Sequence, residues 1–325
     1  AKGPQVAIVG GQVYVAFGMG DALYLSTSSD NGLTYSEPIK VGESGKLSLG
    51  MRRGPRIGVH KGVVTITAIY GDQGRGRDGD IVAFRSADKG KTWSEPVKVN
   101  DVAGSGREGL HAMAIAPDGT LVCTWLDLRD KGTKLFMSVS KDGGAAWSKN
   151  QLVYDSPSGT ICECCHPSLA FDAKGKLVVM FRNSLDGARD MYITESTDLK
   201  TFSPAVKLGE DSWMINACPM DGGMVSVEPN GAIQSIWRRD KKVFRSSAAE
   251  DEQSLGEGSN PWMATGAGGS YFTWQIGAAV YVLTPKAGSS MLSGKGVDPV
   301  VSASEDGALV VAAWTGNGIW ATRLR

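Results

Sequence analysis

Short runs of alternating apolar and polar residues follow one another along the chain, with turn residues between them. Four such runs occupy residues 55–99: PRIGVH, VVTITAIY, DIVAFRS and PVKV. Alternation with a period of two is typical of half-buried β-strands, and the Gly and Asp residues between the runs indicate tight turns. This stretch therefore predicts one four-stranded antiparallel sheet.

The same four-strand unit recurs along the whole chain, and no linker or helical periodicity divides it. Self-similarity of this kind is typical of β-propellers, in which each sheet is one blade. We therefore predict an all-β protein with a single domain over residues 1–325, a β-propeller of four-stranded blades. The count of units gives seven blades; six blades with an irregular end is the alternative, because the last unit offers only three strands. The innermost strands are expected to begin near Gln5, Arg56, His111, His166, Met224, Trp262 and Val300.

Four units share a turn motif that combines Ser, Asp and an aromatic residue. In such a turn the Asp side chain can bond its own backbone, and Gly takes the positive-φ position. The aromatic residue after it is expected to pack between neighbouring sheets. Asp30, Asp88, Asp142 and Asp198 are therefore interpreted as architectural. The segments are SSDNGLTY from Ser28, SADKGKTW from Ser86, SKDGGAAW from Ser140 and STDLKTF from Ser196.

These segments resemble the Asp box, S-x-D-x-G-x-T-W, of sialidases and related propellers. The resemblance is best from Gly54 to Arg189. It implies a clamp of three arginines for a sugar carboxylate, and the planar guanidinium fork suits that role. The clamp residues would be Arg56, Arg182 and Arg239, where Arg239 is preferred to its neighbour because adjacent strand residues point to opposite faces. Asp78 falls near the acid/base Asp of the family.

One position departs from the sialidase pattern. The family activates a Tyr nucleophile with a Glu, and here that Glu position carries His166. An imidazole does not simply replace a carboxylate in that role. The resemblance therefore favours binding of a ligand over ordinary sialidase hydrolysis.

Residues at the starts of inner strands should converge on one mouth of the central channel. Among them are soft ligands that suit copper or zinc, namely Cys164, Cys165, His166, Cys218, His111 and Met220. A disulfide among Cys162, Cys164, Cys165 and Cys218 is the structural alternative, and free thiols are a third. The whole convergent set is Arg52, Arg53, Arg56, Glu108, His111, Cys164, Cys165, His166, Cys218, Met220, Asp221 and Trp262.

Composition narrows the possible partners. The 34 Lys and Arg residues balance 34 Asp and Glu residues, which argues against nucleic acid as a partner. No stretch approaches the roughly 18 apolar residues of a membrane span, so membrane insertion is not expected. The family resemblance and the cysteines lead us to expect a secreted or periplasmic protein whose leader has been removed.

The sequence thus predicts a sialidase-like propeller that binds a small anionic molecule or a glycan at an arginine-lined mouth, beside a Cys/His cluster. Two alternatives remain open at this point. One is an exo-sialidase or other glycoside hydrolase that uses different carboxylates. The other is a copper-handling or redox protein.

Overall fold

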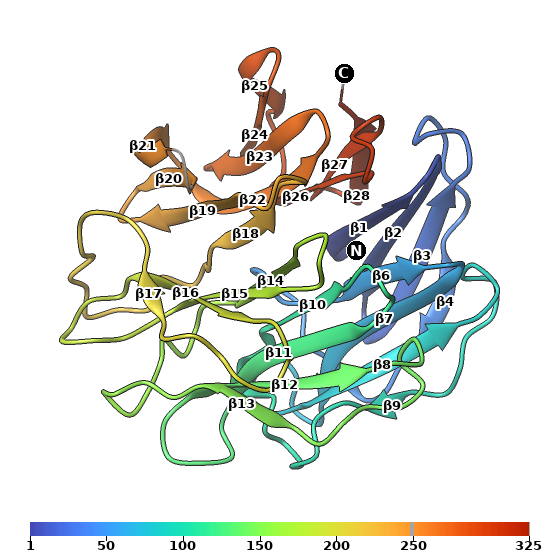
Figure 1. Cartoon of the computed structure of the whole chain (residues 1–325). Coiled ribbons are helices and arrows are strands. Elements are labelled where there is room, and N and C mark those ends of the chain that lie inside the picture. The colour runs from blue at the N-terminus through green and yellow to red at the C-terminus, as the bar shows by residue number, and fades with distance from the viewer. Residues whose placement is uncertain (248–249, 325) are drawn as a thin grey trace.

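Seven antiparallel sheets surround a central axis in the computed structural model, which describes residues 1–247 and 250–324 (Figure 1). The prediction of a seven-bladed propeller is confirmed. Blade 1 contains β1 (Lys2–Val9), β2 (Gln12–Met19), β3 (Ala22–Ser28) and β4 (Ile39–Gly42). Blade 2 contains β6 (Arg56–His60), β7 (Val63–Gly71), β8 (Asp80–Ser86) and β9 (Val97–Lys98), and β5 (Lys46–Leu47) pairs with the far end of β7.

The next three blades follow the same order from the axis outward. Blade 3 contains β10 (His111–Ile115), β11 (Leu121–Asp127), β12 (Lys134–Ser140) and β13 (Gln151–Tyr154), preceded by the short 3-10 helix η1 (Arg107–Gly109). Blade 4 contains β14 (Ser168–Phe171), β15 (Leu177–Arg182), β16 (Met191–Ser196) and β17 (Val206–Lys207). Blade 5 contains β18 (Met224–Val227), β19 (Ile233–Arg239), β20 (Lys242–Ser247) and β21 (Glu250–Glu257).

The last two blades differ in strand number. Blade 6 contains β22 (Ser259–Gly266), β23 (Gly269–Ile276), β24 (Ala279–Thr284) and β25 (Gly288–Ser293). Blade 7 has only β26 (Val297–Ala303), β27 (Val310–Thr315) and β28 (Ile319–Arg323), as the sequence predicts. No helix among the described residues has the length and apolar character needed to span a bilayer.

The core lies between the blades, because each sheet is covered on both faces by its neighbours. All seven residues of β11 and all six of β15 are buried. These second strands are accordingly apolar at most positions on both faces, where a sheet with one wet face would alternate. Separate apolar clusters fill the successive interfaces; one of them joins Trp237 and Phe244 of blade 5 to Met180 of blade 4.

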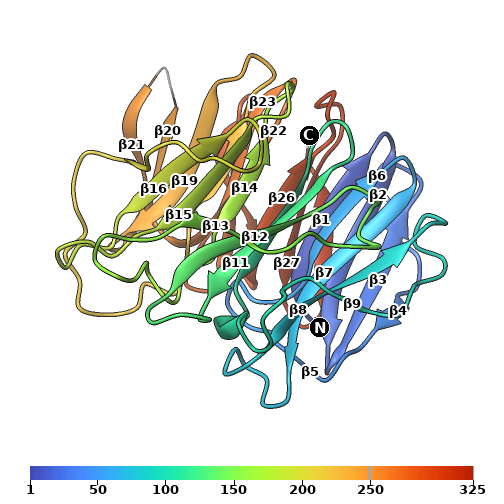
Figure 2. The same cartoon turned by 60° about the horizontal axis from the view of Figure 1, so that its bottom comes forward.

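The ring closes by side-chain packing. Within the described strands β1 is hydrogen-bonded only to β2, so the first strand does not complete blade 7. Instead Val13, Val15 and Phe17 of β2 pack against Leu309 and Val311 of blade 7. Both views place the blue N-terminal strands directly beside the red C-terminal ones (Figures 1 and 2).

The Asp-containing turns join the third and fourth strands of blades 1 to 4. In blade 2 the Asp88 carboxylate accepts hydrogen bonds from Thr92 N at 2.9 Å and from Thr92 Oγ1 at 2.6 Å, and Ser86 Oγ accepts one from Gly90 N at 2.8 Å. The aromatic residue that follows, Trp93, packs into the cluster between blades 1 and 2. Antiparallel succession puts these turns on the face opposite to the starts of the inner strands.

Candidate functional site at the propeller mouth

Arg52 closes the mouth of the central channel. It precedes β6 in blade 2, and its φ of 57° is in the left-handed region that non-glycine residues seldom adopt. The guanidinium donates to the carbonyl oxygens of Pro299 at 3.0 Å and Pro261 at 3.2 Å, and also to that of Asn260. Arg52 thereby ties blade 2 to blades 6 and 7, and it is 4% exposed.

Trp262 is the aromatic centre of the mouth. Its ring centroid lies 4.9 Å from the Arg52 guanidinium carbon and 5.8 Å from that of Arg56. The imidazole of His166 stacks on the same indole, with centroids 5.9 Å apart and planes inclined by 15°. The guanidiniums of Arg52 and Arg56 and the imidazole of His166 therefore all pack on the Trp262 ring.

His166 is buried with one ring nitrogen engaged. Gly222 N donates to its Nδ1 at 3.0 Å, so the neutral ring carries its proton on Nε2. That Nε2 is buried and has no hydrogen-bond partner among the described residues. Burial, and then the charges of Arg52, Arg56 and Arg182, hold the pKa of His166 well below its usual value. The ring is therefore a neutral donor without an acceptor among the described residues, and three guanidiniums act on it.

A second layer of the mouth is built around Asp221. Its carboxylate accepts a hydrogen bond from Asn260 N at 3.0 Å and lies 3.2 Å from Arg238 Nε. Arg182 donates to the main-chain oxygens of Arg189 at 2.6 Å and Arg238 at 2.8 Å. Arg182 and Arg238 also both lie over the Trp213 ring, at 5.2 and 5.4 Å.

The mouth carries more positive than negative charge. Four guanidiniums (Arg52, Arg56, Arg182 and Arg238) face two carboxylates (Asp221 and Asp298), an excess of two positive charges. Burial lowers the pKa of Arg52 to about 10, and burial together with Arg52 lowers that of Arg56 to about 9. Burying like charges together is costly unless a counter-charge is present.

Two of the predicted ligand-binding arginines, Arg56 and Arg182, lie in this mouth, but Arg239 does not. The Arg239 guanidinium pairs with Glu252 at 2.6 Å and packs over Phe244 in the outer part of blade 5. Its neighbour Arg238 reaches Asp221, so the structure places Arg238 at the mouth in place of Arg239, and the ligand-binding role of Arg239 stays a prediction. Arg238 and Arg239 do point to opposite faces of β19, as strand alternation predicts. Which of these faces is turned toward the mouth depends on how β19 pairs with β18 and β20 in blade 5.

Asp78 serves as a turn former between β7 and β8. Its carboxylate accepts hydrogen bonds from the main-chain nitrogens of Asp72 at 2.8 Å and Gln73 at 3.1 Å. These hydrogen bonds explain the position of Asp78 in the loop as a structural role, without a catalytic one. The assignment as acid/base residue stays a prediction.

The predicted Cys/His set separates into two parts. The sulfurs of Cys162, Cys164 and Cys165 lie within 4.8 Å of one another, and Met220 packs against them. Cys218 is exposed, and its thiol interacts with that of Cys164. Hydrogen bonding with the other two thiols lowers the pKa of Cys162, and burial raises that of Cys165. All five cysteines are unbridged.

Neither histidine belongs to this group of described ligand atoms, and the assignment of His166 and His111 as metal ligands stays a prediction. His166 faces Trp262, as described above. His111 Nε2 lies 3.1 Å from Thr67 Oγ1 in blade 2, where burial and then Arg56 lower its pKa. The sequence places both residues at the starts of inner strands. It does not predict the direction of a side chain in the turn that precedes each strand.

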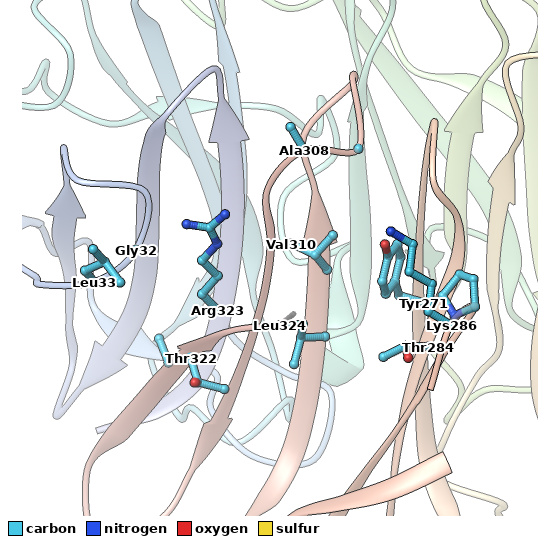
Figure 3. A pocket seen from close by; sticks show the side chains of 13 residues that line it. Gly32, Leu33, Tyr271, Thr284, Lys286, Ala308, Val310, Thr322, Arg323 and Leu324 are labelled. Carbon is cyan, nitrogen blue, oxygen red and sulfur yellow. The ribbon is translucent and has the colours of Figure 1, made fainter. Parts of the chain in front are cut away.

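A cavity much larger than the free space at the mouth lies elsewhere. A groove of about 680 Å³ lies where blades 6, 7 and 1 meet, on the face that carries the Asp-containing turns. Figure 3 shows Arg323 and Leu33 on one side of it and Tyr271 and Lys286 on the other. At the axis, beside Arg56 and Trp262, the free space is only about 60 Å³.

Residues 55–230 match the BNR repeat-like domain family, and since this is more than half of the chain, the protein belongs to that family. It is a sialidase-like propeller, and its fold is shared with enzymes that act on glycans. A search of curated proteins finds no match.

Solved structures with this fold cover nearly the whole chain. An α-L-arabinanase of Penicillium chrysogenum, complexed with arabinobiose, is 16% identical with a TM-score of 0.60, covering 99% of this chain and 92% of its own. An ulvan lyase bound to a glucuronate–sulfated rhamnose unit is 11% identical with a TM-score of 0.58, covering 98% and 91%. The intramolecular trans-sialidase of Ruminococcus gnavus, in complex with oseltamivir carboxylate, is 10% identical with a TM-score of 0.57, covering 99% and 94%.

Proposed function

We propose that this protein binds an anionic ligand, a carboxylate-bearing glycan or sugar acid, at the mouth formed by Arg52, Arg56, His166 and Arg182. The observation that carries the proposal is the surroundings of His166. Three guanidiniums act on its ring, and its Nε2–H is buried without a partner among the described residues. A carboxylate there would accept this hydrogen bond and offset the excess positive charge.

The solved structures support the ligand class. The ulvan lyase is bound to a glucuronate-containing unit and the trans-sialidase to oseltamivir carboxylate. Both ligands carry the group that the mouth of this chain is built to attract. The arabinanase complex, with a neutral disaccharide, shows only that the same fold also takes uncharged sugars.

We propose that Arg52 moves when a ligand enters. Arg52 and His166 are 4 and 1% exposed, and the free space beside Arg56 and Trp262 is small, about 60 Å³. In the proposed complex Arg52 leaves the carbonyls of Asn260, Pro261 and Pro299 and turns to the ligand.

The test compares an arginine at the mouth with a matched arginine outside it. Calorimetry would titrate the protein with N-acetylneuraminate, glucuronate and neutral glucose. Arg56→Gln removes a charge-assisted hydrogen bond, about 1.5–3 kcal/mol, so affinity for the acids should fall about tenfold or more. Arg239→Gln, which alters the pair with Glu252, should leave affinity unchanged.

Three outcomes would count against the proposal. They are equal losses in the two variants, equal affinity for glucose and glucuronate, and no binding of either acid. Release of free sugar from a sialoside by the wild-type protein would instead assign a hydrolase activity to the same mouth.

A further inference from the structure

The three-cysteine cluster has no part in the anion site, although it lies next to it. Cys162, Cys164 and Cys165 come from the loop between β13 and β14, and they are 0, 4 and 1% exposed. The main chain of Cys162 is fixed by a hydrogen bond from its N–H to the Arg182 carbonyl at 3.0 Å. Three thiols are thus held together at a fixed point beside the mouth.

The spacing of the sulfurs is that of a metal site. Cys162 Sγ lies 3.8 Å from Cys164 Sγ and 3.4 Å from Cys165 Sγ. A metal bound about 2.3 Å from each sulfur separates neighbouring sulfurs by about 3.8 Å in a tetrahedral site and about 4.0 Å in a trigonal one. The ion would fit after shifts of a few tenths of an ångström.

The donors are all soft. No carboxylate or imidazole of the described residues belongs to the group of ligand atoms within 4.8 Å, and the side chain packed on the trio is the thioether of Met220. Sulfur donors select Cu(I) and Zn(II) over hard cations. The Arg182 guanidinium, which acts electrostatically on Cys162 and Cys165, offsets part of the negative charge of three bound thiolates.

The number of buried donors distinguishes these two ions. Structural zinc takes four ligands, and here the buried set offers three sulfurs. The fourth thiol, that of Cys218, lies beside Cys164 at the exposed edge. Three-coordinate sulfur ligation suits Cu(I). An exposed thiol next to such a site can bind the ion briefly while it passes between the buried sulfurs and ligands in solution.

We propose that Cys162, Cys164 and Cys165 bind one Cu(I) ion, with Cys218 as the thiol through which it is gained and lost. This site is separate from the anion site. Its ligands are sulfur atoms of the β13–β14 loop, and those of the anion site are Arg52, Arg56, His166 and Arg182. Arg182 acts on the thiols only electrostatically. Failure of one proposal therefore leaves the other intact.

The test titrates the full, reduced chain with Cu(I) under anaerobic conditions against a chromophoric Cu(I) chelator. One equivalent should be retained, and X-ray absorption of the loaded wild-type protein should show three sulfur ligands. Cys162→Ser should weaken retention more than about 100-fold, beyond the usual effect of losing an outer-shell partner. Cys123→Ser, which changes a buried thiol of blade 3, should have no effect.

Other results would overturn the proposal. They are no retention of Cu(I) by the reduced wild type, equal retention by Cys162→Ser, and tighter binding of Zn(II) with four sulfur ligands. A disulfide within residues 162–165 whose reduction does not restore Cu(I) binding would show that the cysteines are a covalent staple. The wild-type absorption measurement decides the ligand number even if Cys162→Ser fails to fold.

Discussion

Single residues at the mouth are charged or polar and almost fully buried, and their partners explain how this is tolerated. Arg52, Arg56 and Arg182 donate to main-chain carbonyls, and Asp221 has Arg238 and the Asn260 N–H. Hydrogen bonds to charged groups are stronger than neutral ones, which compensates part of the lost hydration. The two histidines are instead buried in the neutral form.

The buried histidines predict a loss of stability in mild acid. Burial holds the pKa of His111 and His166 well below the usual value. In the unfolded chain both take up protons below about pH 6.5, while the folded chain does not, so the free energy of unfolding falls as pH falls. The free energy of unfolding should therefore fall progressively as the pH is lowered from 7.5 to 5.

Urea denaturation at pH 5, 6 and 7.5 measures this effect. His111→Gln and His166→Gln should each reduce the dependence of the free energy of unfolding on pH. They are compared with His60→Gln, which removes an imidazole from the far end of β6. A free energy of unfolding that stays constant across this range would contradict the neutral, buried state.

At the scale of elements, the Asp-containing turns are self-contained. Each carboxylate bonds the main chain within four residues, and the aromatic residue at the end of the turn packs against the preceding blade. The turn therefore holds a hairpin and docks it at the same time. Hydrogen bonding by Thr92 and Ser86 also holds the pKa of Asp88 well below its usual range.

The turns predict graded losses of thermal stability. Asp88→Ala leaves Lys91 N, Thr92 N and Thr92 Oγ1 without their acceptor and should lower the melting temperature. Asp88→Asn keeps one oxygen and should lower it less. Asp142→Ala should also cost less than Asp88→Ala, since Ala146 stands where the other turn has the bonding hydroxyl of Thr92. Scanning calorimetry measures all three.

Ligand binding is the control for these variants. Affinity for glucuronate should be unchanged, because the turns lie on the face opposite to the mouth. A larger loss of stability in Asp142→Ala than in Asp88→Ala would contradict the count of hydrogen bonds.

At the scale of the whole molecule, the ring is closed without a shared strand. Blade 7 keeps three strands, and apolar side chains of β1 and β2 pack against it. The interfaces between the other neighbouring blades have the same kind of packing, and there the chain also runs directly from one blade to the next. The closing interface is therefore expected to open first.

Leu309→Ala tests this expectation. Removing this buried side chain should cost about 2–5 kcal/mol, and so should Leu177→Ala in the interface of blades 3 and 4. Hydrogen exchange should distinguish the two variants. Leu309→Ala should speed exchange selectively in β1 and β26–β28, while Leu177→Ala should not. Equal exchange patterns would show that closure is no weaker than the other interfaces.

The sequence by itself determined the repeats, the four-stranded blades, the three-stranded last unit and the inner-strand starts that converge on the mouth, and it favoured seven blades over six. These features follow from local physics: the two-residue period of a strand and the turn chemistry of Asp and Gly. Arg56, His166, Asp221 and Trp262 meet as predicted because the first positions of inner strands share one end of the axis.

Only the tertiary structure decided how side chains are paired within that mouth. It selected Arg238 over Arg239, gave Arg52 its bridge to blades 6 and 7, and grouped Cys162 with Cys164 and Cys165 apart from both histidines. Loops enclose the mouth, and their course is set by hydrogen bonds to residues distant in the chain, such as that from Cys162 N–H to the Arg182 carbonyl. Side chains in such loops do not alternate with a regular period, as they do in a strand. The sequence pattern therefore does not predict their directions.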